Sequence, residues 1–104
     1  MLALKRHPLV RTDLHAAFDW YEDQRPGLGY EFAMEFRSAL RRLRDGPLLY
    51  SIRFADVRRL NLDRFPYGLF YVVRTAEIRL MAVLHGSRDI EPILAERRLH
   101  FEVR

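Results

Sequence analysis

The apolar residues of this 104-residue chain change their spacing halfway along it, and this change limits the folds that the chain can adopt. In the first half, apolar side chains recur every three or four residues over 10–21 and 32–43. The second half instead has three short segments rich in β-branched and aromatic residues: VRRLNL (57–62), GLFYVV (68–73) and IRLMAVLH (78–85). This pattern predicts a helical hairpin followed by a three-stranded antiparallel meander.

Turn-forming residues mark where these elements end. Pro8 can open the first helix, because its missing N–H is not needed at the first helical position. RPGLG (25–29) ends that helix, and Asp45-Gly46-Pro47 ends the second. We expect a short strand before Pro8 and a short helix over 89–98. The prediction is a single α+β domain spanning 1–104, in which a two-helix hairpin packs on one face of a small, mostly antiparallel sheet in the order β-α-α-β-β-β, with a short C-terminal helix.

Strand alternation predicts which side chains face the helical hairpin. On the last strand the inward set is Ile78, Leu80, Ala82 and Leu84, and the outward set is Arg79, Met81, Val83 and His85. Phe70 and Val72 also point outward, so the second face of the sheet is apolar in its centre and basic at its margins. Such a face is too apolar to remain in water, and we expect either the C-terminal helix or a partner chain to cover it.

The charge of the chain indicates which partners it suits. Its formal net charge is +4, its pI is about 10.0, and only one of its 18 basic residues is lysine. Planar guanidinium groups suit phosphate and carboxylate partners, although arginine usage can equally follow genome composition. The chain has no cysteine and no apolar run long enough to cross a bilayer. We expect a cytoplasmic protein without disulfides or a membrane segment.

Four polar residues, Arg59, Arg64, His85 and Arg88, are expected near one another at one end of the sheet. Arginines can bind a phosphate while a histidine exchanges a proton near neutral pH, so this set could cleave RNA without a metal. The alternative is that His85 satisfies backbone groups where a strand ends. The spacing by itself favours this structural role.

The other histidines, aromatic residues and acidic residues do not indicate a metal site or a nucleic-acid-binding site. The remaining histidines, which lack metal-ligand spacing, are His7, His15 and His100. Trp20 and Tyr21 are interpreted as packing residues rather than a base-stacking platform. The acidic residues interpreted as one solvated helix face are Asp19, Glu22 and Asp23. We expect neither a metal nor a cofactor.

Three stretches resemble the RelE/ParE superfamily of bacterial type II toxins: FDWYEDQRPGLGYEF (18–32), VRRLNLDRFPYGLFYVV (57–73) and IRLMAVLHGSRDIEPILAERR (78–98). The resemblance covers nearly the whole chain and is greatest to ParE-like toxins, often labelled plasmid stabilisation proteins. Its most specific residues, in order, are Arg58, Arg59, Phe65, Pro66, Tyr67, Tyr71, His85 and Arg88. It implies the same α+β fold as the periodicity.

The resemblance also implies a biological role and a partner. Members of this superfamily inhibit bacterial growth and are held inactive in a toxin–antitoxin hetero-oligomer. The cognate antitoxin is small and wraps an extended, helical and often acidic tail around the toxin. A basic, partly apolar face suits such a partner, because charge complementarity speeds association.

The superfamily has two activities, and the resemblance leaves both open. RelE-like members cut mRNA on the ribosome, in which case His85 would act with Arg59, Arg64 and Arg88. ParE-like members bind DNA gyrase and need no catalytic residues. The chain has Gly68 where such nucleases often carry arginine, and 89–98 contains no tyrosine, so the ParE-like activity is favoured. The residues expected to contact antitoxin or target are Arg59, Phe70, Arg79, Met81, Arg88, Arg97 and Arg98.

Overall fold

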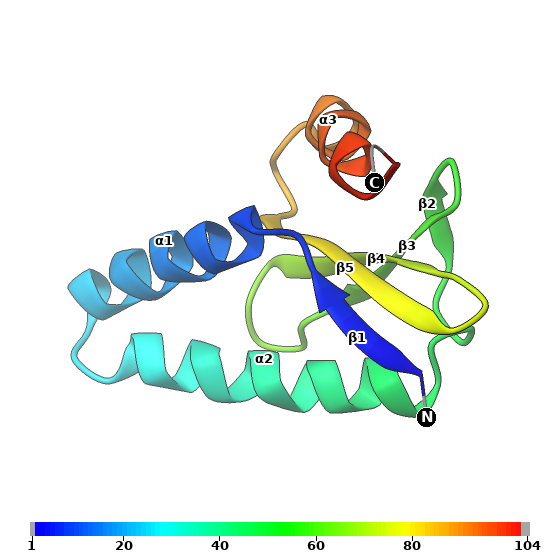
Figure 1. Cartoon of the computed structure of the whole chain (residues 1–104). Helices are drawn as coiled ribbons and strands as arrows, with labels where there is room; N and C mark the ends of the chain where they lie inside the picture. Colours follow the sequence, from blue (N-terminus) through cyan, green and yellow to red (C-terminus); the bar gives the residue numbers. More distant parts are fainter. Residues whose placement is uncertain (1, 103–104) are drawn as a thin grey trace.

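The computed structural model describes residues 2–102 and has the α+β architecture predicted from the sequence (Figure 1). Helices α1 (Leu9–Gln24) and α2 (Leu28–Asp45) lie on one side of a sheet, and α3 (Ile90–Glu102) lies on the other. The strands of the sheet are β1 (Ala3–Arg6), β2 (Ile52–Phe54), β3 (Val57–Asn61), β4 (Tyr67–Val73) and β5 (Glu77–His85).

The strand order in the sheet is β1-β5-β4-β3-β2. Strands β2 to β5 pair antiparallel, which confirms the predicted meander, while β1 pairs parallel with β5. Strand β2 was not predicted. It is only three residues long and mostly exposed, so its side chains show no alternation that a sequence pattern could reveal.

The RPGLG segment forms the tight turn between α1 and α2. Gly27 has a φ of +91°, a conformation that favours glycine. Gly29 lets the helices approach closely, because a Cβ there would lie 2.7 Å from the carbonyl oxygen of Phe18. Glu22 accepts hydrogen bonds from the N–H groups of Gly27 and Gly29, both at 2.9 Å. The prediction that Glu22 belongs only to a solvated face is therefore wrong, because its carboxylate satisfies the N-terminus of α2.

A β-bulge in β5 reverses the expected facing of its last residues. Phe70 pairs with Ala82 and Tyr71 with Leu80, so Met81 is an extra residue between them. Up to Met81 the predicted faces are correct. Beyond it they are wrong: Ala82 and Leu84 face α3, whereas Val83 packs in the core beneath the helical hairpin. An extra residue shifts a period of two by one step, and no alternation pattern announces it.

Helix α3 covers the second face of the sheet, one of the two expected outcomes. Leu94 of α3 is fully buried against the sheet. The core that it joins consists of Val57, Phe70, Val72, Met81, Ala82 and Leu84. Phe70 is 0% and Met81 1% exposed. These two residues, which were expected to contact a partner, are therefore not on an open surface, because the chain's own helix occupies that face.

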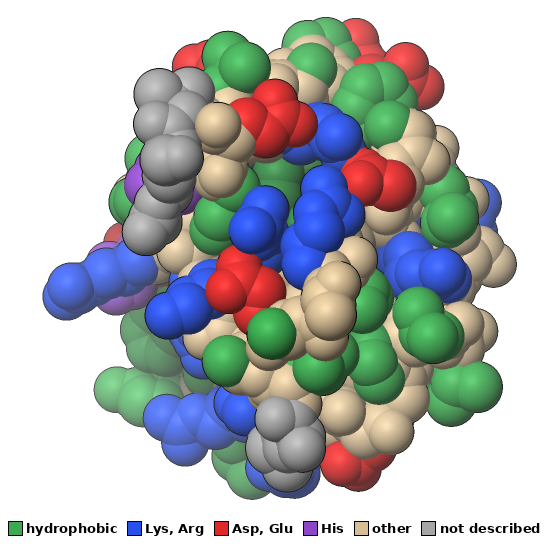
Figure 2. All heavy atoms as spheres, turned by 45° about the vertical axis from the view of Figure 1, so that its right-hand side comes forward, with side chains coloured by type: hydrophobic (Ala, Val, Ile, Leu, Met, Phe, Trp, Pro, Cys, Tyr) green, Lys and Arg blue, Asp and Glu red, His purple; other side chains and the backbone are tan. Residues whose placement is uncertain are grey.

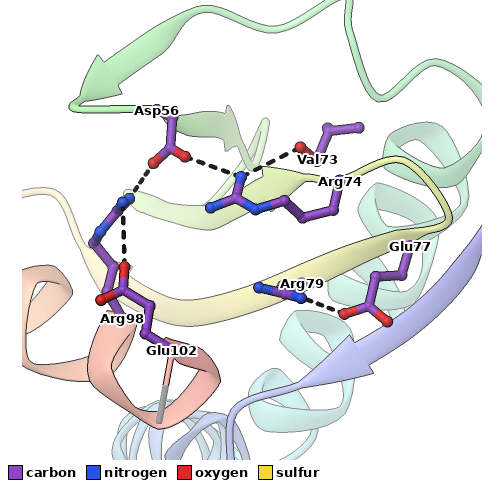
Figure 3. Close-up of polar contacts among 7 residues, drawn as sticks. All are labelled: Asp56, Val73, Arg74, Glu77, Arg79, Arg98 and Glu102. Atoms are coloured by element: carbon purple, nitrogen blue, oxygen red, sulfur yellow. Dashed lines mark hydrogen bonds and ion pairs between the residues drawn. The ribbon is translucent and has the colours of Figure 1, made fainter. Parts of the chain in front are cut away.

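Two adjacent arginines hold α3 in place from opposite sides. Arg97 makes a bidentate ion pair with Asp13 of α1 at 2.6 and 2.9 Å, and the two side chains are only 10% and 8% exposed. Arg98 pairs with Asp56 in the β2–β3 turn (Figure 3). Arg97 and Arg98 were expected to be partner contacts, but the structure uses both of them inside the monomer.

Asp56 also joins α3 to the sheet. It accepts hydrogen bonds from Arg98 and from Arg74, the latter at 2.9 Å (Figure 3). Burial by itself would raise the pKa of Asp56, but these hydrogen bonds outweigh it and lower the pKa. Arg79 pairs with Glu77 at 2.6 Å and lies over the ring of Phe101, 5.4 Å from its centroid. Figure 2, turned toward this side, shows acidic side chains among the basic ones.

Candidate functional site

The four polar residues predicted to form a site lie at the same end of the sheet but line two different hollows. The first hollow, of about 440 Å³, is lined by Arg59, Arg64 and Gly86, among others. The second, of about 380 Å³, is lined by His85 and Arg88 together with residues of α1. Tyr67, the first residue of β4, lines both. The β-bulge contributes to this separation, because it turns His85 toward α1.

The Arg59 side chain lies flat across the end of the sheet. Its guanidinium is 5.1 Å from the centroid of the Phe70 ring, and its Nε donates a hydrogen bond to Asn61. Glycines make room for it: a Cβ on Gly68 would lie 2.6 Å from Arg59 Nε, and one on Gly86 would lie 3.3 Å from a terminal nitrogen. Gly68, which departs from the nuclease pattern, therefore has a structural reason.

Arg59 is also a partly buried cation without an anionic partner. Among residues 2–102, no carboxylate forms an ion pair with its guanidinium. Burial, and then the neighbouring positive charge of Arg53, lowers the pKa of Arg59. An arginine remains charged at neutral pH even so. The end of the sheet thus carries a positive charge that the monomer leaves uncompensated.

Arg64 is directed toward α2. It forms an ion pair with Glu31 at 2.6 Å, and the backbone N–H groups of Asp63 and Arg64 donate hydrogen bonds to Glu35. The hydrogen bond from Arg64, followed by that from Arg25, lowers the pKa of Glu31. These contacts fix the β3–β4 loop on the helical hairpin, and they engage Arg64 with a carboxylate.

His85 accepts a hydrogen bond at its Nδ1 from the backbone N–H of Ser87, at 3.0 Å. Its ring lies edge-on to Tyr67, with the centroids 5.2 Å apart. The N–H of Arg88 donates to the carbonyl oxygen of His85, which closes the turn after β5. Burial raises the pKa of Tyr67, while the charge of Arg88 opposes this. The His85 ring thus has one nitrogen engaged with the backbone.

The second hollow contains an exposed aromatic residue that the sequence interpretation missed. Tyr21 is buried as predicted, but Trp20 is 58% exposed and lines the hollow beside Tyr67, His85 and Arg88. Trp20 does pack edge-on against the Tyr21 ring, with the centroids 5.1 Å apart, but it lies outside the core and most of its surface is exposed. Adjacent residues of a helix point in directions 100° apart, so only one of the pair can follow the apolar stripe. This angle between adjacent helical residues is the feature of the sequence that could have indicated the exposure of Trp20.

A third hollow, of about 480 Å³, lies between α1 and α2, next to β1. Its apolar lining includes Phe18, Phe32 and Phe36, and it is completed by basic groups and smaller apolar residues: Arg6, Leu14, His15, Ala33, Arg37 and Leu40. Arg6 lies over the Phe36 ring, 5.7 Å from its centroid. The helical periodicity indicates each apolar stripe but not the groove, which depends on how the two helices cross.

Residues 2–102 contain no group of three or more histidine, aspartate or glutamate side chains placed to hold a metal ion. No helix within the same residues is long and apolar enough to cross a membrane.

The fold and its hollows define a small, basic α+β protein of the class built around a helical hairpin on an antiparallel sheet. Residues 4–90 match the family described as ParE toxin of type II toxin-antitoxin system, parDE, and the chain belongs to this family. It is therefore the toxin component of a type II toxin–antitoxin system, of ParE type. Most of α3 lies beyond the matched range.

A solved structure has the same fold. It is described as the chromosomal ParDE TA system from P. aeruginosa, and it superposes with a TM-score of 0.67 at 20% sequence identity. The match covers 82% of this chain and 96% of the other. No curated protein sequence matches.

Proposed function

We propose that this toxin inhibits growth by binding DNA gyrase in the cytoplasm, and that it does not cleave mRNA. The observation that supports this proposal is the separation of the four polar residues into two hollows. General acid–base cleavage requires the proton-transferring group and the phosphate-binding groups to converge on one phosphodiester. Here Arg59 and His85 line different hollows, and Arg64 is paired with Glu31.

The test compares both activities of the purified toxin. DNA breaks that require gyrase are expected, and ribosome-dependent cleavage of mRNA is not. His85→Ala should retain growth inhibition, because the Nδ1 of the ring is engaged by the backbone N–H of Ser87, which is a structural role. Ribosome-dependent cleavage that disappears in both His85→Ala and Arg59→Gln would establish the nuclease alternative instead.

Membership of a parDE family implies a cognate antitoxin, and we propose that its acidic, apolar tail binds in the groove between α1 and α2. Phe32 and Phe36 offer apolar contacts there, while Arg6 and Arg37 offer positive charge. The exposed edge of β1 borders the same region. The product would be a toxin–antitoxin hetero-oligomer.

Filling the groove tests this placement. Ala33→Trp adds volume inside the groove without changing charge, so the variant should remain toxic but should bind the antitoxin encoded beside it at least tenfold more weakly. Arg88 lines the second hollow, so Arg88→Gln serves as the control and should leave antitoxin affinity unchanged. Circular dichroism checks folding. Full neutralisation of a folded Ala33→Trp toxin would place the antitoxin elsewhere.

A further inference from the structure

The two hollows that share Tyr67 each contain an unusual side chain. Arg59 in the first has no carboxylate partner, and the indole of Trp20 in the second lies mostly exposed, outside the core. Elsewhere in residues 2–102, ion pairs hold the guanidinium groups of Arg25, Arg42, Arg64, Arg74, Arg79, Arg97 and Arg98. Other arginines within this range also lack an ion pair, but Arg59 combines that lack with partial burial: it is held by Asn61 and Phe70 and lies near the positive charge of Arg53. An anion bound here would offset both the repulsion and the lost hydration.

The second hollow supplies surfaces of another kind. The exposed indole of Trp20 and the side chain of Arg88 line it, and Tyr67 joins it to the first hollow. Asp13 and Asp63 lie in these linings as well, but Asp13 is neutralised by Arg97 and Asp63 lies 3.9 Å from Arg42. The two hollows, which share Tyr67, thus bring two arginines and an exposed aromatic ring to one end of the sheet.

We propose that these two hollows form a track for a single strand of nucleic acid. Arg59 and Arg88 bind phosphates, and a base stacks on Trp20. Proteins that bind single strands combine cations along the backbone with exposed aromatic rings, because every unpaired base has a face that can stack. A duplex hides those faces. An acidic peptide could use the arginines but would leave Trp20 without a matching partner.

The proposal does not depend on which enzyme the toxin inhibits, because it concerns direct contact with the strand. Tryptophan fluorescence can test it, since Trp20 is the only tryptophan of the chain. Titration of the purified full-length toxin with oligothymidylate of about 12 nucleotides at low salt should quench the emission to a saturating limit. Oligouridylate should bind within a few-fold, because no contact to a 2′-hydroxyl is proposed.

Matched variants separate this track from general attraction by a basic protein. Arg59→Gln should weaken binding roughly tenfold and reduce the slope of log K against log salt by about one. Arg41→Gln removes the same charge from an exposed position on α2 that lines neither hollow, and it should change affinity less than about twofold. Arg59→Lys, which keeps the charge, should weaken binding less than Arg59→Gln.

Gly68→Ala tests geometry without any change of charge. The added Cβ would lie 2.6 Å from Arg59 Nε, so the guanidinium must move and affinity should fall. Circular dichroism establishes that each variant is folded. The proposal is overturned if the oligonucleotide does not bind, if it binds without changing Trp20 emission, if Arg41→Gln weakens binding as much as Arg59→Gln, or if a duplex of equal length binds more tightly. None of these outcomes affects the proposed inhibition of gyrase.

Discussion

His7, at the junction of β1 and α1, is the buried histidine of this protein, with 8% of its surface exposed. Its Nδ1 accepts a hydrogen bond from the N–H of Leu9 at 3.0 Å, which helps to start α1. Its ring lies edge-on to His100 of α3, with the centroids 4.9 Å apart. Burial, followed by the charges of Arg97 and His100, lowers the pKa of His7. Asp13 and Glu96 oppose this effect but do not cancel it.

This environment predicts that stability falls on acidification. The folded state binds a proton at His7 less readily than the unfolded chain, so the stabilisation is complete above pH 6.5 and is lost as the pH falls below that value. Urea unfolding at a series of pH values measures the effect. His7→Asn retains an oxygen that can accept from Leu9 but cannot be charged, so its unfolding midpoint should decrease less between pH 7.5 and pH 5.5. Parallel curves for the two proteins would contradict this account.

At the scale of secondary-structure elements, the position of α3 against the rest of the fold depends on the ion pair between Arg97 and Asp13. Strand β1 ends opposite Leu80, so beyond Leu80 the backbone of β5 has a neighbouring strand only on its β4 side. Asp13 accepts a hydrogen bond from the N–H of Val83 at 2.9 Å, and Arg97 donates to the carbonyl oxygen of Met81 at 3.2 Å. The pair that fixes α3 thus also completes the edge of the sheet.

Breaking this pair should be costly. Arg97→Met leaves the buried carboxylate of Asp13 unpaired, and we expect the free energy of unfolding to decrease by about 3 kcal/mol. Asp13→Asn combined with Arg97→Met removes the isolated charge while an amide oxygen can still accept from Val83, so the double variant should be more stable than the sum of the two single changes predicts. Urea unfolding of all four proteins gives the coupling energy, and a coupling near zero would refute this role for the pair.

The apolar contact between α3 and the sheet can be tested by truncating the side chain of Leu94. Leu94 is fully buried in the same core as Phe70 and Met81. Leu94→Ala should lower the free energy of unfolding by about 3 kcal/mol, because it leaves a cavity in the smaller core. Leu99→Ala is a suitable control, since Leu99 is 55% exposed on the same helix. Similar losses for both variants would contradict the burial account, because alanine is at least as good a helix former as leucine and neither change weakens the helix itself.

At the scale of the whole molecule, one sheet separates two cores of unequal size. The core beneath α1 and α2 includes five large aromatic rings: Tyr21, Phe32, Phe36, Phe65 and Tyr71. The core beneath α3 is smaller, and α3 contributes only Leu94 to its fully buried residues. The last turns of α3 rest on ion pairs that are partly exposed to solvent. Opening of α3 therefore exposes less apolar surface than opening of the helical hairpin would.

Hydrogen exchange should reveal this order. We expect amides of α3 to exchange faster than those of β4 and β5, because local opening of α3 requires less free energy than global unfolding. Mass spectrometry of deuterated peptides from the intact toxin gives the comparison. Equal protection of α3 and β4 would mean that the two cores unfold as one unit.

The sequence predicted part of the site and not its arrangement. Arg59, His85 and Arg88 do lie at the predicted end of the sheet, although His85 is on the opposite face from the one that the alternation predicted. Their division between two hollows follows in part from the extra residue at Met81, which no local pattern marks. The exposure of Trp20 was not predicted, because a helical stripe indicates only on average which side chains are covered.

The sequence by itself determined the order of the elements, the family and the apolar character of both sheet faces, because spacing, turn residues and composition are local properties. Only the tertiary structure decided that α3 covers the second face, that Arg97 and Arg98 bind Asp13 and Asp56, and that Arg59 remains unpaired. These outcomes depend on contacts between residues distant in sequence, whose energies arise only once the chain has brought them together.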